Sequence, residues 1–230
     1  MPRSAAIFTP EIFKFFRELS RHNEKPWMDA NRERYQQHVV APFRALLEAL
    51  APAALALDSG FDLSGRTGAN FSRINRDIRF RPDTPPYHTH MYLTFSGAGK
   101  KGRTGGQLYV GVAADAVTAG FRIYGTGKED SLATMATPRA LKNLAWLGRQ
   151  KKRLERKYES YWYAIEKREW IKKGGWPLTP AEWKKIGGWI VRRALAPEAV
   201  LRPQFVSEAA GIFRELYPLY AFVSQANWKP

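Results

Sequence analysis

The sequence predicts an α+β fold in which an antiparallel β-meander is flanked by N- and C-terminal helices. Apolar residues recur at helical spacing over the first 50 residues and again after Pro203. Between these segments, from about residue 89 to residue 125, apolar and polar residues alternate with a period of two, which indicates strands. Helices that are separated along the chain from a run of strands are typical of α+β proteins.

The composition is that of a folded protein with a substantial core. The chain has 230 residues, of which 44% are hydrophobic and 13% aromatic, and it shows no internal repeat, low-complexity segment or linker. We therefore expect one α+β domain over residues 1–230. The absence of cysteine excludes disulfides and thiolate chemistry. No signal peptide and no apolar run of about 18 residues is recognisable, so we expect a cytoplasmic protein without a membrane partner.

Two helical segments are predicted near the N-terminus. The first begins with Thr9 as the N-cap and Pro10 at the first helical position, and it ends near residue 22. The second begins with Asp29 as its N-cap, and Pro42 either kinks it or starts a new helix. The apolar face that follows this proline consists of Phe43, Leu46, Leu47 and Leu50.

Three strands are predicted in the middle of the chain. In the first, Met91, Leu93 and Phe95 alternate with polar side chains that occupy the opposite face. Residues 107–113 and 117–125 each place apolar side chains on one side, and only a short turn separates them. These two segments therefore form an antiparallel hairpin.

The C-terminal part is predicted to be mainly helical. Pro138 starts one helix, and Thr179 is the N-cap of another, in which Glu182 stands one position short of a capping box. The run GWIVRRAL at residues 188–195 is short and apolar enough for a strand. The last helical face is interrupted at Pro218.

The chain is strongly basic, and one region concentrates both charge and aromatic residues. Its net charge is +16, from 37 basic and 21 acidic residues. Residues 139–193 contain 16 basic residues against five glutamates, together with six of the eight tryptophans. Such a mixture can neutralise phosphates and stack on unpaired bases, which favours nucleic acid as a partner. In the alternative interpretation the tryptophans fill the core and the basic residues form its solvated rim.

A second charged segment has the sequence RINRDIRFRPDTPPYHTH, from Arg73 to His90. If it is extended, the period of two places four polar side chains on one face: Arg73, Asn75, Asp77 and Arg79. The guanidinium groups can bind a ligand carboxylate or phosphate, with Arg76 contributing from beside this face. Alternatively, the arginines and Asp77 form a closed structural network. Asp77 and Asp83 are the acids within this segment, and this shortage favours an anionic partner.

The end of this segment contains two histidines and a tyrosine. His88 and His90 share one face of a strand, where they can bind a metal with Asp77 or Asp83 or can be ordinary polar-face residues. A His-x-His pair alone does not define a metal site, so we expect neither a metal nor another cofactor. Tyr87 can supply a binding hydroxyl or pack its ring beneath the prolines.

The charged segment resembles the bacterial domain-of-unknown-function family 2461. Its signature is approximately Arg-x-x-Arg-Asp-x-Arg-Phe followed by Asp-Lys-x-x-Tyr. The matching positions are Arg73, Arg76, Asp77, Arg79, Phe80, Asp83 and Tyr87. The family's Asn-x-x-x-Trp-x-x-x-Asn-x-x-x-Tyr pattern is matched by Asn23, Trp27, Asn31 and Tyr35. Thr84 replaces the usual lysine, and the resemblance implies a fold class and a candidate site but no activity.

Two functional hypotheses follow from the sequence. The first is an anion- or nucleic-acid-binding module that uses the arginine motif and the basic aromatic region. Its candidate binding residues are Arg73, Arg76, Asp77, Arg79, Tyr87, His88 and His90. The alternative is an enzyme that acts on a small anionic, phosphorylated substrate, with Asp77 or His90 transferring a proton. The sequence does not decide whether the protein is an enzyme, nor does it define the oligomeric state.

Overall fold

The computed structural model describes residues 5–79, 83–97, 105–125, 136–167, 169–225 and 227–230. Helices form the N-terminal quarter and much of the second half of the chain. The N-terminal helices are α1 (Glu11–Arg21), α2 (Lys25–Ala30), α3 (Arg32–Tyr35), the π-helical turn η1 (Gln36–Val40) and α4 (Ala41–Leu57). The later helices are α5 (Ala136–Lys142), α6 (Leu144–Leu154), α7 (Pro180–Lys185), the 3-10 helix η2 (Pro197–Leu201) and α8 (Phe205–Ser224).

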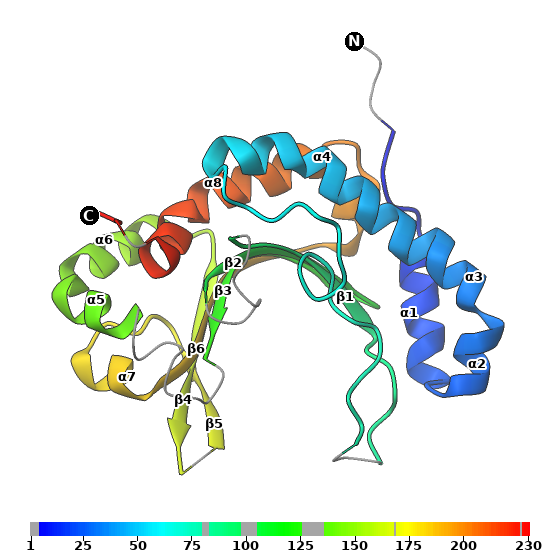
Figure 1. Cartoon of the computed structure of the whole chain (residues 1–230), viewed down its shortest axis with the longest axis horizontal. Coiled ribbons are helices and arrows are strands. Elements are labelled where there is room, and N and C mark those ends of the chain that lie inside the picture. Colours follow the sequence, from blue (N-terminus) through cyan, green and yellow to red (C-terminus); the bar gives the residue numbers. More distant parts are fainter. Residues whose placement is uncertain (1–4, 80–82, 98–104, 126–135, 168, 226) are drawn as a thin grey trace.

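All six named strands belong to one antiparallel sheet. They are β1 (His90–Phe95), β2 (Gln107–Ala113), β3 (Val117–Tyr124), β4 (Glu159–Glu166), β5 (Glu169–Gly174) and β6 (Ile186–Leu195). Their order in the sheet is β1-β2-β3-β6-β4-β5. The first three strands are the predicted meander, and helices from both ends of the chain flank the sheet, so the α+β prediction is confirmed (Figure 1).

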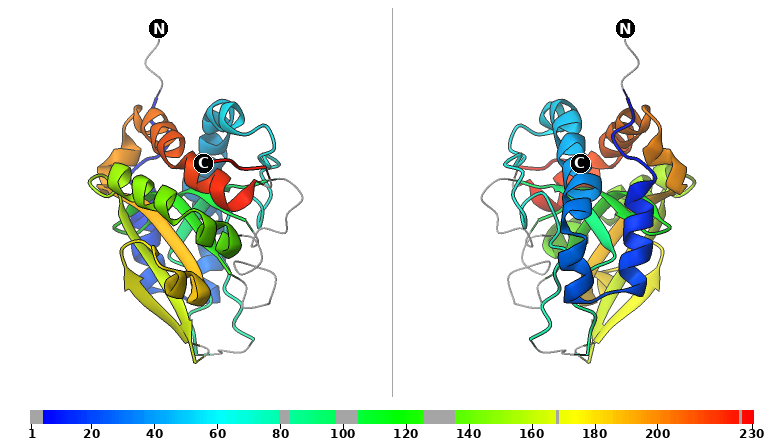
Figure 2. Two further views of the ribbon diagram at one scale, coloured as in Figure 1. Left: turned by 90° about the vertical axis from the view of Figure 1, so that its left-hand side faces the viewer. Right: turned by 90° about the vertical axis from the view of Figure 1, so that its right-hand side faces the viewer.

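The core lies between one face of the sheet and the two long helices α4 and α8. These helices lie side by side over the arched sheet (Figure 2), and α8 packs directly on β2 and β3. The side chains of Met91, Leu93 and Phe95 are buried in this core, as their alternation predicts. The hairpin register then places Val110 opposite Ala119, and both are fully buried on the same face.

Several helix boundaries differ from those that the sequence predicts. Asp29 lies inside α2, which begins at Lys25 with Pro26 in its first turn, so the N-cap assigned to Asp29 is wrong. The helix predicted from Pro138 is divided at Asn143 into α5 and α6. Glu182 does complete a capping box with Thr179, because N3 lies three positions after the N-cap.

Two prolines lie inside long helices without ending them. Pro52 is within α4, and Pro218 is within α8, which continues to Ser224. Both helices bury one face in the core, and this burial outweighs the backbone hydrogen bond that each proline removes. The continuous helical run Arg32–Leu57 is long and apolar enough to cross a membrane by length and composition alone. Buried core helices pass the same test, and the inner side of this one packs Phe43 and Leu46 into the core.

Candidate ligand-binding face of the sheet

The arginine motif forms most of a two-stranded arm beside the edge of β1. We call residues 72–79 and 83–88 the arm. Its two sides are joined by backbone hydrogen bonds from the Arg76 N–H to the Pro86 carbonyl (2.8 Å) and from the His88 N–H to the Ile74 carbonyl (2.7 Å). At its base, the Ser72 N–H donates to the Tyr92 carbonyl of β1 at 3.0 Å. The arm therefore extends away from the sheet while staying attached to it (Figure 1).

Exposure alternates along the first side of the arm, as an extended chain requires. Arg73, Asn75 and Asp77 are exposed, whereas Ile74 and Arg76 are half-buried. Phe80 lies outside the described residues, and in the part that the structure describes Arg73 makes no hydrogen bond or ion pair. The structure thus separates Arg73 from Arg76, which point to opposite sides of the arm.

Asp77 and Arg79 form a local, exposed ion pair. The Arg79 Nε and Nη2 atoms donate to the two carboxylate oxygens of Asp77 at 2.9 and 2.6 Å. The hydrogen bonds from the Arg79 side chain and backbone lower the pKa of Asp77 to about 2. One of the two arrangements considered from the sequence, pairing within the motif, therefore holds for these two residues.

Tyr87 is buried and fastens the arm to the N-terminal helices. The Asn23 side chain makes two hydrogen bonds with the Tyr87 backbone. Asn23 Nδ2 donates to the Tyr87 carbonyl, and the Tyr87 N–H donates to Asn23 Oδ1, both at 2.9 Å. Further along, Asn31 Nδ2 donates to the Trp27 carbonyl at 2.9 Å, and the rings of Trp27 and Tyr35 pack on Phe15. The N-terminal asparagine pattern therefore positions the arm and contributes no side chain to the sheet face.

Replacing Asn23 with alanine is expected to lower the free energy of unfolding by about 1–3 kcal/mol. The variant loses two hydrogen bonds and leaves the Tyr87 N–H without its partner. Urea unfolding followed by tryptophan fluorescence measures the change. Asn23→Asp keeps the acceptor but loses the donor, so it should fall between the wild type and Asn23→Ala; an unchanged midpoint for Asn23→Ala would contradict the positioning role.

His88, His90 and Tyr92 form a row of rings along one side of the arm and β1. The ring centroids of His88 and His90 are 5.0 Å apart, and those of His90 and Tyr92 are also 5.0 Å apart. Burial and then the nearby cations His88, Arg76 and Arg122 lower the pKa of His90 to about 4. Burial and Arg76 also lower the pKa of His88. Within the described ranges, no third His, Asp or Glu joins the pair in a metal-binding group.

The free energy of unfolding is expected to decrease from about pH 6.5 to pH 4, because unfolding lets His90 bind a proton in this range. The folded state holds the pKa of this imidazole at about 4, below its unfolded value near 6.5, so the unfolded state binds more protons in this interval. We expect a loss of about 1–2 kcal/mol after allowance for solvent screening. Urea titrations of wild type and His90→Gln between pH 4.5 and 7.5 test this. The free energy of unfolding of the wild type must decrease relative to that of His90→Gln as pH falls.

Next to this row, an arginine packs against two neighbouring tyrosine rings on the second face of the sheet. The Arg122 guanidinium carbon is 4.6 Å from the Tyr92 ring centroid and 4.7 Å from that of Tyr109. Arg122 Nε also donates to Gln107 Oε1 at 2.8 Å. Tyr109 is buried but lies outside the core cluster, as expected for a residue on the face that points away from α4 and α8.

The same face continues across β6, β4 and β5 with a second group of cations and rings. Lys172 Nζ lies 4.2 Å from the centroid of the Tyr161 ring, and the Arg192 guanidinium carbon is 5.2 Å from it. Arg192 is also paired with Glu159 at 2.6 Å. Beyond them lies a cluster of rings at centroid distances of 5.8–6.4 Å: Tyr124, Tyr163 and Trp170. We call this surface, from Tyr92 to Trp170, the open face.

Glycines on neighbouring strands let the large side chains lie flat on the open face. A Cβ atom at Gly111 would be 2.3 Å from Cε1 of Tyr92, its cross-strand partner. A Cβ atom at Gly188 would be 2.6 Å from Cδ1 of Tyr124. Both distances are shorter than any tolerable contact, so glycine at these positions is required by the packing of the two tyrosines.

The sequence of the chain matches one protein-family model over residues 11–222, which includes the arm and almost all of the sheet and helices. The chain belongs to the DUF2461 family of conserved hypothetical proteins. No curated protein matches it. The DUF2461 match confirms the resemblance carried by the arginine and asparagine motifs.

In this DUF2461 chain, the residues of the open face are ones that the motif did not identify. Arg122 is the charged residue in the middle of an otherwise apolar strand, in which Val117, Ala119, Phe121 and Ile123 are buried in the core. The opposite side of the same alternation contains Arg122 and Tyr124. Alternation can therefore predict which side chains share a face, but the pairing of β3 with β6 requires the tertiary structure.

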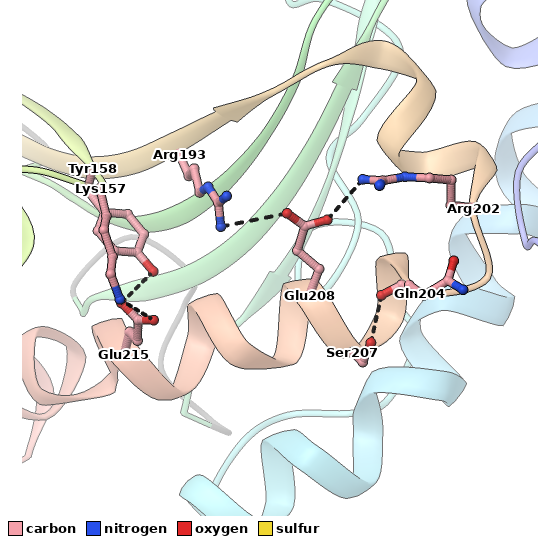
Figure 3. Close-up of polar contacts among 8 residues, drawn as sticks. All are labelled: Lys157, Tyr158, Arg193, Arg202, Gln204, Ser207, Glu208 and Glu215. Atoms are coloured by element: carbon pink, nitrogen blue, oxygen red, sulfur yellow. Dashed lines mark hydrogen bonds and ion pairs between the residues drawn. The ribbon is translucent and has the colours of Figure 1, made fainter.

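The basic aromatic region of residues 139–193 is divided between the core and the surface. Five of its six tryptophans are buried, and Trp170 alone among them is exposed, at 45%. Some of its cations form ion pairs with glutamates of α8, as Figure 3 shows. Glu208 forms an ion pair with Arg193 at 3.6 Å and another with Arg202, from outside this region, at 3.4 Å, while Glu215 pairs with Lys157 at 3.2 Å. The tryptophans thus mainly form core, and fewer cations remain for a ligand than the composition suggests.

A pocket of about 340 Å³ lies at another part of the molecule. It is formed by α1, the turn between β2 and β3, and η2, and is lined by Pro10, Phe13, Arg17, Ala114, Asp115, Pro197, Glu198 and Leu201. None of the site residues predicted from the sequence lines it. It therefore does not supply the enclosed, arginine-lined cavity that the enzyme hypothesis expects.

Proposed function

We propose that this protein binds single-stranded nucleic acid on the open face of its sheet. The observation that supports this most directly is the Arg122 guanidinium held against the Tyr92 and Tyr109 rings. It belongs to the face that α4 and α8 leave uncovered. Cations and aromatic rings on a sheet surface are the combination by which proteins contact phosphates and stack unpaired bases.

The distribution of groups on the open face fits a flexible strand better than a duplex. Cations alternate with rings along the sheet, from Arg122 near β1 to Lys172 at the edge strand β5. A single strand can turn its bases onto such rings, whereas the bases of a duplex are stacked on each other and are not available. The partly exposed rings of Tyr124 (38%) and Trp170 (45%) provide further stacking positions at the β5 side.

Proton transfer to a small anionic substrate by Asp77 or His90 is less well supported. Asp77 is ion-paired with Arg79, and its pKa of about 2 makes it a weak proton acceptor near neutral pH. His90, with a pKa of about 4, is also a weak base. Both features are compatible with binding and do not favour general acid–base catalysis.

Fluorescence anisotropy with labelled oligonucleotides tests the proposal. We expect a single-stranded 12-mer to bind more tightly than the corresponding duplex, with affinity falling as salt rises. Three contacting cations would give a log–log salt slope of about −2 for a single strand. Equal or tighter binding of the duplex, or no binding at low salt, would overturn the proposal.

A further inference from the structure

We propose that Arg76, His88 and His90 form a subsite for a phosphate monoester at the β1 end of the open face. The inference rests on the proposed function, because the subsite adjoins the open face through Tyr92 and would receive a terminal phosphate of the bound strand. The ligand chemistry is that of a dianion with several exposed oxygens. It is available from the phosphorylated end of a nucleic acid or from a free sugar phosphate.

The backbone of the arm holds Arg76 and His88 in place, and His90 is the first residue of β1. The N–H of Arg76 and the N–H of His88 take part in the two hydrogen bonds that join the sides of the arm. Arg76 Nε donates to the Tyr87 carbonyl at 3.2 Å, which orients the guanidinium group. Since Asn23 in turn makes two hydrogen bonds with the Tyr87 backbone, the position of Arg76 is fixed relative to the N-terminal helices.

The polar atoms of this cluster are oriented but not satisfied by the protein. Among the residues that the structure describes, neither imidazole makes a side-chain hydrogen bond, and the Nη atoms of Arg76 have no partner. No buried side-chain nitrogen or oxygen in the described ranges is left unsatisfied, so these nitrogens remain accessible to water or to a ligand. The cluster therefore presents guanidinium and imidazole nitrogens that are accessible to a ligand.

The groups that shift the pKa values of the two imidazoles are cationic or neutral. The groups that act on the two imidazoles are Arg76 from the arm, Arg122 from β3 and each other, with the Tyr92 phenol ring alongside His90. No carboxylate is among them. Gathering these cations is unfavourable without an anion, and a bound dianion would stabilise the protonated imidazoles.

Proton binding and anion binding are linked at this subsite, so the affinity for an anion should depend on pH. A dianion next to His88 and His90 should raise both imidazole pKa values, so the affinity for the anion should increase as pH falls. Sulfate is the suitable probe, because it keeps two negative charges throughout the range in which histidine titrates. Imidazole Cε1–H signals in NMR spectra follow each histidine separately.

We expect saturating sulfate to raise the pKa of His90 by about one unit and sulfate affinity to be about fivefold higher at pH 5 than at pH 8. Arg76→Gln should weaken sulfate binding about tenfold. Arg73→Gln is the matched control: it removes the same charge from the exposed side of the arm, outside the cluster, and should change the affinity less than about twofold. Histidine pKa values that do not respond to sulfate, or equal effects of the two substitutions, would overturn the subsite.

Oligonucleotides distinguish the source of the phosphate and separate this inference from the proposed function. A 5′- or 3′-phosphorylated 12-mer that binds about tenfold more tightly than the unphosphorylated 12-mer, with the gain lost in Arg76→Gln, supports a strand terminus. Competition by ribose 5-phosphate with no gain from a terminal phosphate supports a free sugar phosphate. Binding of the unphosphorylated 12-mer with no effect of any phosphate monoester would leave the open face supported and would refute the subsite.

Discussion

Replacement of Arg122 by glutamine is expected to weaken binding of a single-stranded 12-mer by about tenfold to a hundredfold. The guanidinium group packs against the rings of Tyr92 and the buried Tyr109, so its loss removes a phosphate contact and also disturbs the position of the Tyr92 ring. Because Arg122 makes no ion pair in the part of the chain that the structure describes, no carboxylate is left unpaired by the substitution. The salt slope should become shallower by about 0.7.

Two further variants test the geometry of this effect. Arg122→Lys keeps the charge but cannot stack on the rings as a planar group, so we expect an intermediate affinity with the wild-type salt slope. Arg214→Gln removes an exposed cation from α8, which packs on the opposite face of the sheet, and should bind like the wild type. Urea unfolding confirms that each variant is folded. If Arg214→Gln and Arg122→Gln weaken binding equally, the protein attracts nucleic acid through its net charge and not through this face.

Replacement of Trp189 by alanine is expected to lower the free energy of unfolding by about 3–5 kcal/mol. Its side chain is fully buried and meets the rings of Phe121, Trp176 and Trp183 at centroid distances of 5.1–5.9 Å. The indole Nε1 also donates to the Ser160 hydroxyl at 3.0 Å. The variant therefore leaves a large cavity where β6, β4 and α7 meet and loses a hydrogen bond.

Trp170→Ala is the matched control for this prediction. Trp170 is 45% exposed on the edge strand β5, so its removal should change the free energy of unfolding by less than about 1 kcal/mol. It should instead weaken binding of the single-stranded 12-mer, since its ring belongs to the open face. Chemical denaturation and anisotropy measured on both variants separate the two roles. A Trp170→Ala variant as unstable as Trp189→Ala would contradict the division of the basic aromatic region into core and surface.

The strands that could be predicted are those whose pattern is local. Residues of β1, β2 and β3 alternate cleanly because one face of each strand is buried under α4 and α8. β5 was not predicted, because nearly all of its residues are exposed at the edge of the sheet and no apolar alternation marks it. The basic stretch that leads into β4 is divided between the end of α6 and the strand, and its charges are compatible with either structure.

The candidate site shows the same division between local and long-range information. The arginine motif and its extended form were predictable, since the residues are adjacent in the sequence and alternate in exposure. The association of Tyr92 with Tyr109 and Arg122 was not, because these residues come from three strands whose register is set by the whole sheet. The thirteen-residue N-terminal pattern from Asn23 to Tyr35 was predictable in the same way. The hydrogen bonds between Asn23 and Tyr87 were not, because these residues are 64 positions apart in the chain.

The sequence by itself determined the family, the α+β class, the central meander and the location of an arginine-rich motif. These depend on composition, on local periodicity and on residues that are close along the chain. The tertiary structure decided which cations remain available, because ion pairing and ring packing depend on partners that are distant in sequence. Glu208 and Glu215 form ion pairs with Arg193 and Lys157 on the side of α8, whereas Arg122 packs against two tyrosines on the opposite face of the sheet.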